Sequence, residues 1–387
     1  MQDSQMKNKT RIKKIKLLPP SKENVRNSEG SIVELSDGRL LLVYSHFYRK
    51  KEEDRWGGDN APAYLAGRFS GDGGESWDKK DSLVIPNEGK ENVMSVSLLR
   101  LQGSAIILVY AIKNGYDDCR YFIRKSVDET KTWGKKICVT KERGYYVVNN
   151  DRVIQISGGR LLVPACSHPN PDVTTLGQRG KILVRYSDDE GKTWHKSKTT
   201  LESPFPHGAI LSEIGVKAGE WWPSSDVTHL TGFQEPGLVE LADGSLFLWA
   251  RTDLGCQYVS RSFNQGLTWS KPEPSELISP CSPASIKRIP KTGDLLVIYN
   301  DHSGRFPFPP GKRTPLVAAI SKNGGRTWQN HKIIEGDPDG HYCYTAITFR
   351  EDKVILAYCA GSSKIGSKAY GLSLTQITLL DLNCLYN

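Results

Sequence analysis

Residues 232–269, GFQEPGLVELADGSLFLWARTDLGCQYVSRSFNQGLTW, decide how the rest of the chain is interpreted. Two short apolar runs, 238–241 and 246–249, flank Ala242-Asp243-Gly244, and this pattern predicts a β-hairpin. A third run at 256–260 leads into an octet, 262–269, of the form Ser-x-Asp/Asn-x-Gly-x-Thr-Trp. The stretch therefore predicts three successive strands followed by a distinctive turn.

The octet recurs along the chain, with copies that begin at residues 70, 126, 187, 262 and 321. Within it, Asp or Asn can bond the backbone of its own turn, Gly can adopt a positive φ, and Trp can cover the turn. The copy at 126 has Thr130 in place of Gly. We interpret the octets as structural turns, and their spacing of 56 to 75 residues leaves room for about four strands each.

Hairpins like the one at 238–249 recur at 31–44, 96–110, 153–164, 285–299 and 345–358. Because there are six hairpins and five octets, we expect residues 372–380 and an N-terminal strand near 12–18 to complete the last sheet. Such a closure removes a free sheet edge. We predict an all-β fold, a six-bladed β-propeller of four-stranded antiparallel sheets. It would form a single domain over residues 1–387, with 1–11 as a disordered basic tail.

Composition narrows the classes of partner. The net charge is +9, but the basic residues are dispersed, so we expect a small anionic ligand and no nucleic acid. The eight cysteines stand singly without metal-binding spacing, and we expect no cofactor and no metal. The longest apolar run, 105–112, is too short to span a bilayer, so no membrane insertion is expected. We expect a cytoplasmic protein, or a secreted or periplasmic one if a signal peptide has been removed.

The predicted topology assigns residues to two faces. If the first strand of each sheet runs down a central tunnel, its N-terminal end and the loop after the second strand lie on one face. The octets then lie on the opposite face, so functional residues should precede first strands or follow second strands. In the fourth sheet Glu235 precedes the first strand and Arg251 ends the second.

Gln-Glu-Pro-Gly-Leu-Val-Glu-Leu, Asp-Gly and Trp-Ala-Arg, together with the octets, resemble the exo-sialidase (neuraminidase) family, in which the octets are called Asp boxes or BNR repeats. The resemblance covers most of the chain. It implies a retaining exo-glycoside hydrolase that removes terminal sialic acid, or a related acidic sugar, from glycoconjugates. It also implies that Arg251 and Arg313 belong to a carboxylate-binding arginine triad.

The same resemblance implies the catalytic residues. Tyr344 matches the nucleophile, with Tyr342 as a near competitor that would otherwise bind substrate. Asp59, eleven residues before the first octet, matches the acid/base residue, and Asp54 is the reserve candidate. Glu235 matches the residue that takes the proton from the tyrosine.

The third arginine departs from the family pattern. The family begins its first inner strand with Arg-Ile-Pro, whereas Ser28-Glu29-Gly30 occupies that register here. Arg26 and Arg152 are the two candidates for the missing residue. Because positions two apart on a strand point the same way, we predict that Arg26 completes the cluster.

These residue types suit the chemistry. Arginine binds a carboxylate through two parallel hydrogen bonds, and a sialic acid carries a carboxylate on its anomeric carbon. That carboxylate repels an anionic nucleophile, which is why sialidases use tyrosine. A phenol needs a neighbouring carboxylate to take its proton, and a carboxyl group must protonate the leaving oxygen. The alternatives are a non-catalytic carbohydrate-binding propeller, favoured by the missing Arg-Ile-Pro, and a hydrolase for another acidic sugar.

Overall fold

The computed structural model describes residues 12–168, 179–204 and 232–386, and this part of the chain is all-β with two short 3-10 helices. The helices are η1 (Glu52–Trp56) and η2 (Leu382–Leu385). The predicted basic tail, 1–11, lies outside the described residues, and the single-domain boundary stays a prediction. No helix of the described part is long and apolar enough to cross a membrane.

Four sheets have four antiparallel strands each, as the repeats predict. One contains β2 (Asn24–Glu34), β3 (Leu40–Tyr48), β4 (Ala63–Ser70) and β5 (Ser82–Ile85). Another contains β16 (Gln234–Glu240), β17 (Leu246–Arg251), β18 (Cys256–Ser262) and β19 (Glu273–Ile278). A third contains β20 (Ser285–Arg288), β21 (Leu295–Asn300), β22 (Leu316–Ser321) and β23 (Gln329–Glu335). The last contains β24 (Gly340–Arg350), β25 (Lys353–Ser362), β26 (Thr375–Asp381) and β1 (Lys13–Leu18).

The remaining strands form one ten-stranded sheet, which differs from the two separate sheets expected here. Its first part is β6 (Asn92–Arg100), β7 (Ile106–Gly115), β8 (Asp118–Ser126) and β9 (Ile137–Cys138). Its second part is β10 (Tyr145–Val147), β11 (Ile154–Gln155), β12 (Leu161–His168), β13 (Lys181–Ser187), β14 (His195–Lys196) and β15 (Leu201–Glu202). A single parallel pair, Tyr145 with Cys119, joins the parts, because β10 lies between β8 and β12 and bonds to both.

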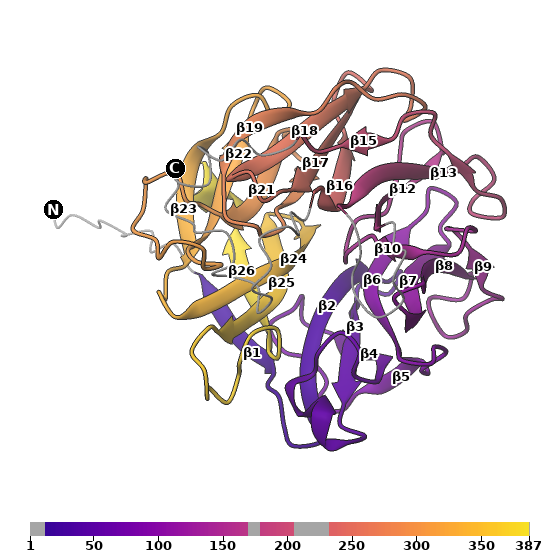
Figure 1. Cartoon of the computed structure of the whole chain (residues 1–387), viewed down its shortest axis with the longest axis vertical. Coiled ribbons are helices and arrows are strands. Elements are labelled where there is room, and N and C mark those ends of the chain that lie inside the picture. Colours follow the sequence, from indigo (N-terminus) through magenta and orange to yellow (C-terminus); the bar gives the residue numbers. More distant parts are fainter. Residues whose placement is uncertain (1–11, 169–178, 205–231, 387) are drawn as a thin grey trace, which may run out of the picture.

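The N-terminal strand closes the last sheet, as expected. Strand β1 pairs antiparallel with β26 in a register that places Ile15 opposite Ile377. In Figure 1 the sheets lie side by side around a common centre, and the first and last strands of the chain meet in one sheet. Apolar clusters fill the space between successive sheets; for example, Trp249 and Leu295 lie in one cluster between β16–β19 and β20–β23. The core is therefore distributed between the sheets.

The octets form the local turns that the sequence predicts. In the copy at 187–194, Ser187 Oγ donates to Asp189 Oδ1 (2.7 Å), and Gly191 N donates to Ser187 Oγ (2.8 Å). Gly191 has a φ of 89°, and Trp194 Nε1 donates to the Gly191 carbonyl (3.0 Å). Thr130 adopts the same left-handed conformation at φ 66°. The turn geometry is therefore kept where the glycine is absent, at the cost of strain.

A short segment of polar residues, 149–152, crosses between sheets where the inner strands converge. The Asp151 carboxylate accepts from Ser31 Oγ of β2 (3.0 Å), Lys287 Nζ of β20 (2.9 Å) and the Ile347 amide of β24 (2.9 Å). The Asp151 amide donates to the Val96 carbonyl of β6 (2.9 Å). One residue thus ties together the inner strands of four sheets.

The strained octet gives a stability prediction. Thr130→Gly should raise the free energy of unfolding by about 0.5–1 kcal/mol, because relief of the left-handed strain exceeds the entropy cost of glycine. Chemical denaturation measures the change. Gly191→Thr is the matched control and should destabilise, since a Cβ there would lie 2.8 Å from Ile123 Cδ1. A destabilised Thr130→Gly variant would contradict the assignment.

Candidate functional site

Four inner strands carry the same irregularity at the end where the candidate residues lie. In β2, β6, β16 and β24 the strand register shifts by one extra residue, between Ser28 and Ser31, Met94 and Ser97, Gln234 and Gly237, and Cys343 and Ala346, respectively. The first bulged residue has a left-handed φ of 49–58° in each case: Glu29, Ser95, Glu235 and Tyr344. Such bulges change the direction of a side chain and concentrate at functional sites.

Two of these bulged residues meet. Tyr344 Oη donates to Glu235 Oε1 at 2.9 Å, and Arg251 Nη1 donates to Glu235 Oε2 at 2.6 Å. Arg251 ends β17 and lies opposite Gln234 in the sheet register, so the hairpin itself places it beside Glu235. The Glu235 carboxylate is therefore held by a cation on one oxygen and faces the Tyr344 hydroxyl with the other.

Arg313 lies against the same tyrosine. Its guanidinium carbon is 5.6 Å from the Tyr344 ring centroid, and its Nη1 donates to Cys343 Sγ (3.1 Å). Cys281 connects the two arginines, because its sulfur accepts from Arg251 Nε (3.2 Å) and its carbonyl accepts from Arg313 Nη2 (3.5 Å). Both guanidinium groups are buried and are held in part by sulfur and carbonyl acceptors, and two buried cations side by side favour an anionic ligand.

Burial strongly affects the ionisation of this cluster. Desolvation raises the pKa of Tyr344 well above its usual range, and the Glu235 carboxylate raises it further. Arg313 and Arg251 act in the opposite direction without reversing the shift. The phenol is therefore protonated at neutral pH, and it becomes nucleophilic only if a base such as Glu235 takes its proton.

Asp59 and Arg26 form a second part of the site. Arg26 Nη1 donates to Asp59 Oδ1 at 2.7 Å, and the Asp59 side chain is 57% exposed. Desolvation opposes ionisation of Asp59, but Arg26 outweighs it, and Lys113 and Arg313 add to the effect, so the pKa of Asp59 is lowered. Asp59 thus lies within electrostatic reach of Arg313, which belongs to the first part.

Arg26 is fully engaged by groups of the protein. Besides Asp59, it donates to Ser28 Oγ (2.7 Å), to the Gly57 carbonyl (3.1 Å) and to the Glu29 carboxylate. Arg26 thus lies at the site, as the strand geometry predicts. Its role as the third arginine stays a prediction, because an incoming carboxylate would compete with Asp59 for it.

Arg152, the other candidate for the third arginine, points to a different partner. Its guanidinium donates to the Ala284 carbonyl (2.8 Å) and to Ser285 Oγ (3.2 Å), at the start of β20. Burial lowers the pKa of Arg152 to about 10, while the charges of Asp151, Glu235 and Tyr344 oppose the shift. The side chain lies within electrostatic reach of the cluster and braces β20.

Two expected alternatives lie elsewhere. Tyr342, named as a competing nucleophile and substrate ligand, packs in the apolar cluster between β20–β23 and β24–β26, with its ring 6.5 Å from that of Tyr358. The strand register shifts between Cys343 and Ala346, so Tyr342 and Tyr344 have different surroundings, and the role of Tyr342 stays a prediction. Asp54 accepts from the Lys50 and Lys51 amides (3.0 and 2.9 Å) and caps η1.

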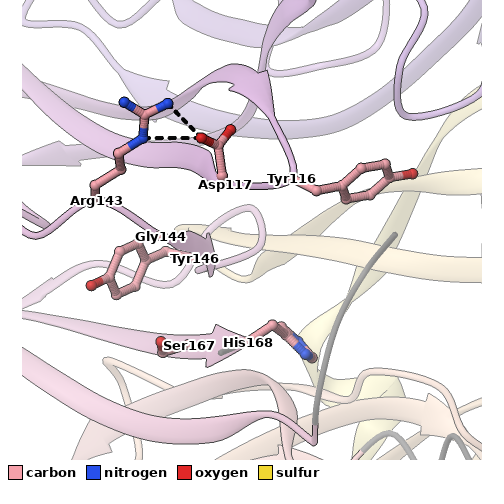
Figure 2. A pocket seen from close by; sticks show the side chains of 7 residues that line it. All are labelled: Tyr116, Asp117, Arg143, Gly144, Tyr146, Ser167 and His168. Carbon is pink, nitrogen blue, oxygen red and sulfur yellow. Dashed lines mark hydrogen bonds and ion pairs between the residues drawn. The ribbon is translucent and has the colours of Figure 1, made fainter. Parts of the chain in front are cut away.

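A pocket of about 400 Å³ lies between β7–β8, β10 and β12. It is lined by Tyr116, Asp117, Arg143, Gly144, Tyr146, Ser167 and His168. Figure 2 shows the Arg143–Asp117 ion pair along one side, with Tyr116 and His168 turned to the other. Asn60, the neighbour of Asp59, donates to Tyr116 Oη (3.4 Å). We call this cavity the rim pocket.

Sequence reasoning missed Glu29 and the sulfur contacts of both arginines. Glu29 could have been found by spacing, because it stands nine residues before the hairpin glycine Gly38, as Glu235 stands before Gly244. Cys281 and Cys343 gave no signal, since each is a single cysteine outside any recognised motif. Among the described residues, no group of three or more His, Cys, Asp or Glu side chains could hold a metal ion.

The chain resembles known proteins in both sequence and fold. The family described as the BNR repeat-like domain matches residues 93–356. A protein of unknown function from Dyadobacter fermentans shares the fold, with a TM-score of 0.67 and 15% identity over 96% of this chain and 99% of that one. A Hadza microbial sialidase gives a TM-score of 0.67 and 16% identity, with 93% of this chain and 66% of that one covered.

The sialidase of Trypanosoma rangeli, solved with 2,3-difluorosialic acid as a covalent intermediate, gives a TM-score of 0.68 and 15% identity. The match covers 97% of this chain and 60% of that one. The present chain therefore spans about 60 to 66% of the length of these two sialidases. At such identities the likeness shows a sialidase-like fold.

The buried Arg251–Glu235 pair gives a stability prediction. Glu235→Ala should lower the free energy of unfolding by about 3–5 kcal/mol, because it leaves the Arg251 cation buried without its carboxylate. Glu190→Ala is the matched control: Glu190 also has a left-handed φ and an ion pair, with Lys125, but it is exposed. The control should lose less than about 1 kcal/mol. Equal losses in urea denaturation would contradict the assignment.

Proposed function

This chain belongs to the BNR repeat-like family, and from that premise we propose that it is a retaining exo-acting glycoside hydrolase of sialidase type. It would act from a closed six-bladed propeller and remove a terminal sialic acid, or a related acidic sugar, from glycoconjugates. The hydrogen bond between Tyr344 and Glu235, beside two buried arginines, carries the proposal. Structural relatives that are named as sialidases support it.

Substrate recognition would rest on charge. The carboxylate of an acidic sugar would bind Arg251 and Arg313, whose positions are fixed through Cys281. Arg313 Nε has no hydrogen-bond partner in the structure and is buried, so it is a free donor for such a group. Arg26 would join them when the sugar carboxylate displaces Asp59 from it.

The reaction would proceed in two steps. In the first, Glu235 takes the Tyr344 proton, the phenolate oxygen attacks the anomeric carbon, and the glycosidic C–O bond breaks as Asp59 protonates the leaving oxygen. In the second, Asp59 takes a proton from water, which attacks the anomeric carbon and releases the tyrosine, and Glu235 returns the proton to Tyr344. Two displacements retain the anomeric configuration.

The leaving group would lie in the rim pocket. Asp59 must face the leaving oxygen, and its neighbour Asn60 donates to Tyr116, which lines the rim pocket. Tyrosine faces and the hydrogen-bonding groups of Arg143, Ser167 and His168 suit a neutral sugar. We therefore extend the proposal to a sugar leaving group.

A non-catalytic carbohydrate-binding function is the second candidate. Its support is that Asp59 and Glu29 engage Arg26, which leaves two arginines for the sugar carboxylate. A binding protein of this kind would hold an acidic sugar without releasing the leaving group. Turnover by the wild type decides between the candidates.

The nucleophile gives the main prediction. The wild type should release 4-methylumbelliferone from its sialic acid conjugate, and Tyr344→Phe should lower kcat at least about 10³-fold, because the attacking oxygen is removed. Tyr342→Phe, altered in the core cluster, is the matched control and should keep kcat. If the correctly folded wild type shows no turnover on a panel of acidic glycosides, the hypothesis that the protein is a hydrolase is refuted.

The arginines give a second prediction. Arg313→Gln should weaken binding of a carboxylate inhibitor about 10- to 150-fold, the value of one charge-assisted hydrogen bond. Isothermal titration calorimetry measures the affinity. Arg261→Gln, on the octet side of β18, is the control and should bind like the wild type. Equal affinity of Arg313→Gln and the wild type would place the sugar carboxylate elsewhere.

The rim pocket gives a third prediction. Tyr116→Ala should lower kcat/KM about 10-fold for a sialylated disaccharide, since one ring contact with the leaving sugar is lost. The same variant should hydrolyse the fluoride of the acidic sugar at the wild-type rate, because fluoride cannot occupy the rim pocket. A parallel fall for both substrates would mean that Tyr116 supports the site and not the leaving group.

A further inference from the structure

Glu29 occupies a position that the fold uses for pocket residues. It is the left-handed bulged residue of β2, at the place where β16 carries Glu235 and β24 carries Tyr344. Its side chain is buried, and Ser95, the bulged residue of β6, donates to Glu29 Oε2 at 2.5 Å. The four bulged residues thus form two hydroxyl–carboxylate pairs, Tyr344–Glu235 and Ser95–Glu29.

The second pair acts on Arg26. The Arg26 guanidinium lies between two carboxylates, with Nη2 bound to Glu29 and Nη1 bound to Asp59. Glu29 and Arg26 are both buried, whereas Asp59 is exposed to an incoming substrate. Glu29 therefore affects Asp59 through Arg26. It lies on the buried side of Arg26, away from an incoming substrate.

We propose that Glu29 is a positioning residue of the active site, which fixes Arg26 against Asp59 and offsets part of its positive charge. This inference rests on the proposed function in one respect: Asp59 must act as the acid/base residue. Without the negative charge of Glu29, Arg26 would hold the Asp59 anion more strongly. The pKa of Asp59 would then be lower, and a smaller fraction of Asp59 would be protonated at a given pH.

Several charged and titratable groups surround Asp59 and Glu29 and influence their ionisation. The groups that act on Asp59 are Arg26, Glu29, Lys113, Cys119, Tyr145 and Arg313. Those that act on Glu29 are Arg26, Asp59, Ser95, Tyr121, Glu235 and Cys359. Burial raises the pKa of Glu29 above its usual value, although the Arg26 cation opposes that shift.

The sign of the effect follows from these charges. As a general acid, Asp59 must be protonated, so kcat/KM falls as pH rises through the pKa of Asp59 in the free enzyme. Glu29→Gln keeps the shape and removes the negative charge, which lowers the pKa of Asp59. The alkaline limb of the kcat/KM profile should move to lower pH by about one pH unit, the size expected for like charges several ångströms apart in a partly buried site.

The test uses two independent readouts on the full chain. One is the pH profile of kcat/KM with the 4-methylumbelliferyl sialoside. The other is the titration midpoint of the Asp59 carboxyl carbon by ¹³C NMR, assigned with Asp59→Asn, which needs no turnover. Thermal unfolding and near-ultraviolet circular dichroism check that each variant is folded. Glu129→Gln is the matched control. Glu129 lies in the octet 126–133 and is paired with Arg100, so its removal should leave both readouts unchanged.

Glu29→Gln should shift both readouts to lower pH by about one unit. Ser95→Ala, which removes only the hydrogen bond to Glu29, should shift them in the same direction by less, and it serves if Glu29→Gln does not fold. A folded variant with an unmoved midpoint, or with activity lowered equally at all pH values, overturns the inference. If the midpoint shifts but the wild type shows no turnover, the hydrolase hypothesis is refuted, while the effect of Glu29 on the ionisation of Asp59 is supported.

Discussion

The Asp151 carboxylate is the interaction on which the arrangement of the inner strands depends. It accepts hydrogen bonds from β2, β20 and β24, while its own amide bonds to β6. A buried carboxylate is costly unless its oxygens are satisfied, and here Lys287 supplies the countercharge. The next residue along the chain, Arg152, extends the network to the start of β20. The neighbouring Asn150 Nδ2 donates to the Gly30 and Tyr344 carbonyls (2.7 and 3.0 Å), so the same segment also fixes the backbone beneath two bulges.

The site is built on backbone strain that this network sustains. Glu29, Ser95, Glu235 and Tyr344 all adopt a left-handed conformation without being glycine, which costs on the order of 1–2 kcal/mol per residue. In return, each bulge turns a side chain away from the strand alternation and toward the site. The close packing around the bulges keeps this geometry: Gly237 follows Glu235 because a Cβ there would lie 2.1 Å from Trp249. The strain at these four positions is therefore tied to the site, whereas the strain at Thr130 belongs to an octet turn.

Much of the site depends on one pattern, in which buried cations are shared among several acceptors. Arg251 binds Glu235 and Cys281, Arg313 binds Cys343 and the Cys281 carbonyl, and Arg26 binds Glu29 and Asp59. Arg313 is held by sulfur and carbonyl acceptors, whereas Arg251 and Arg26 each bind a carboxylate of the protein.

Local signals in the sequence determined the repeats, the hairpins and the octet turns, because each is held by hydrogen bonds within eight residues. They also placed Glu235 beside Arg251, since a two-strand hairpin fixes that register. Only the tertiary structure showed that Tyr344 contacts Glu235 while Tyr342 packs in an apolar cluster, because a one-residue bulge lies between Cys343 and Ala346. It also decided the partners of Arg26, Arg152 and Glu29, and it merged two expected sheets through the pair Tyr145 and Cys119. These contacts join residues that are distant in the chain, so their geometry depends on how whole sheets pack, which no local pattern encodes.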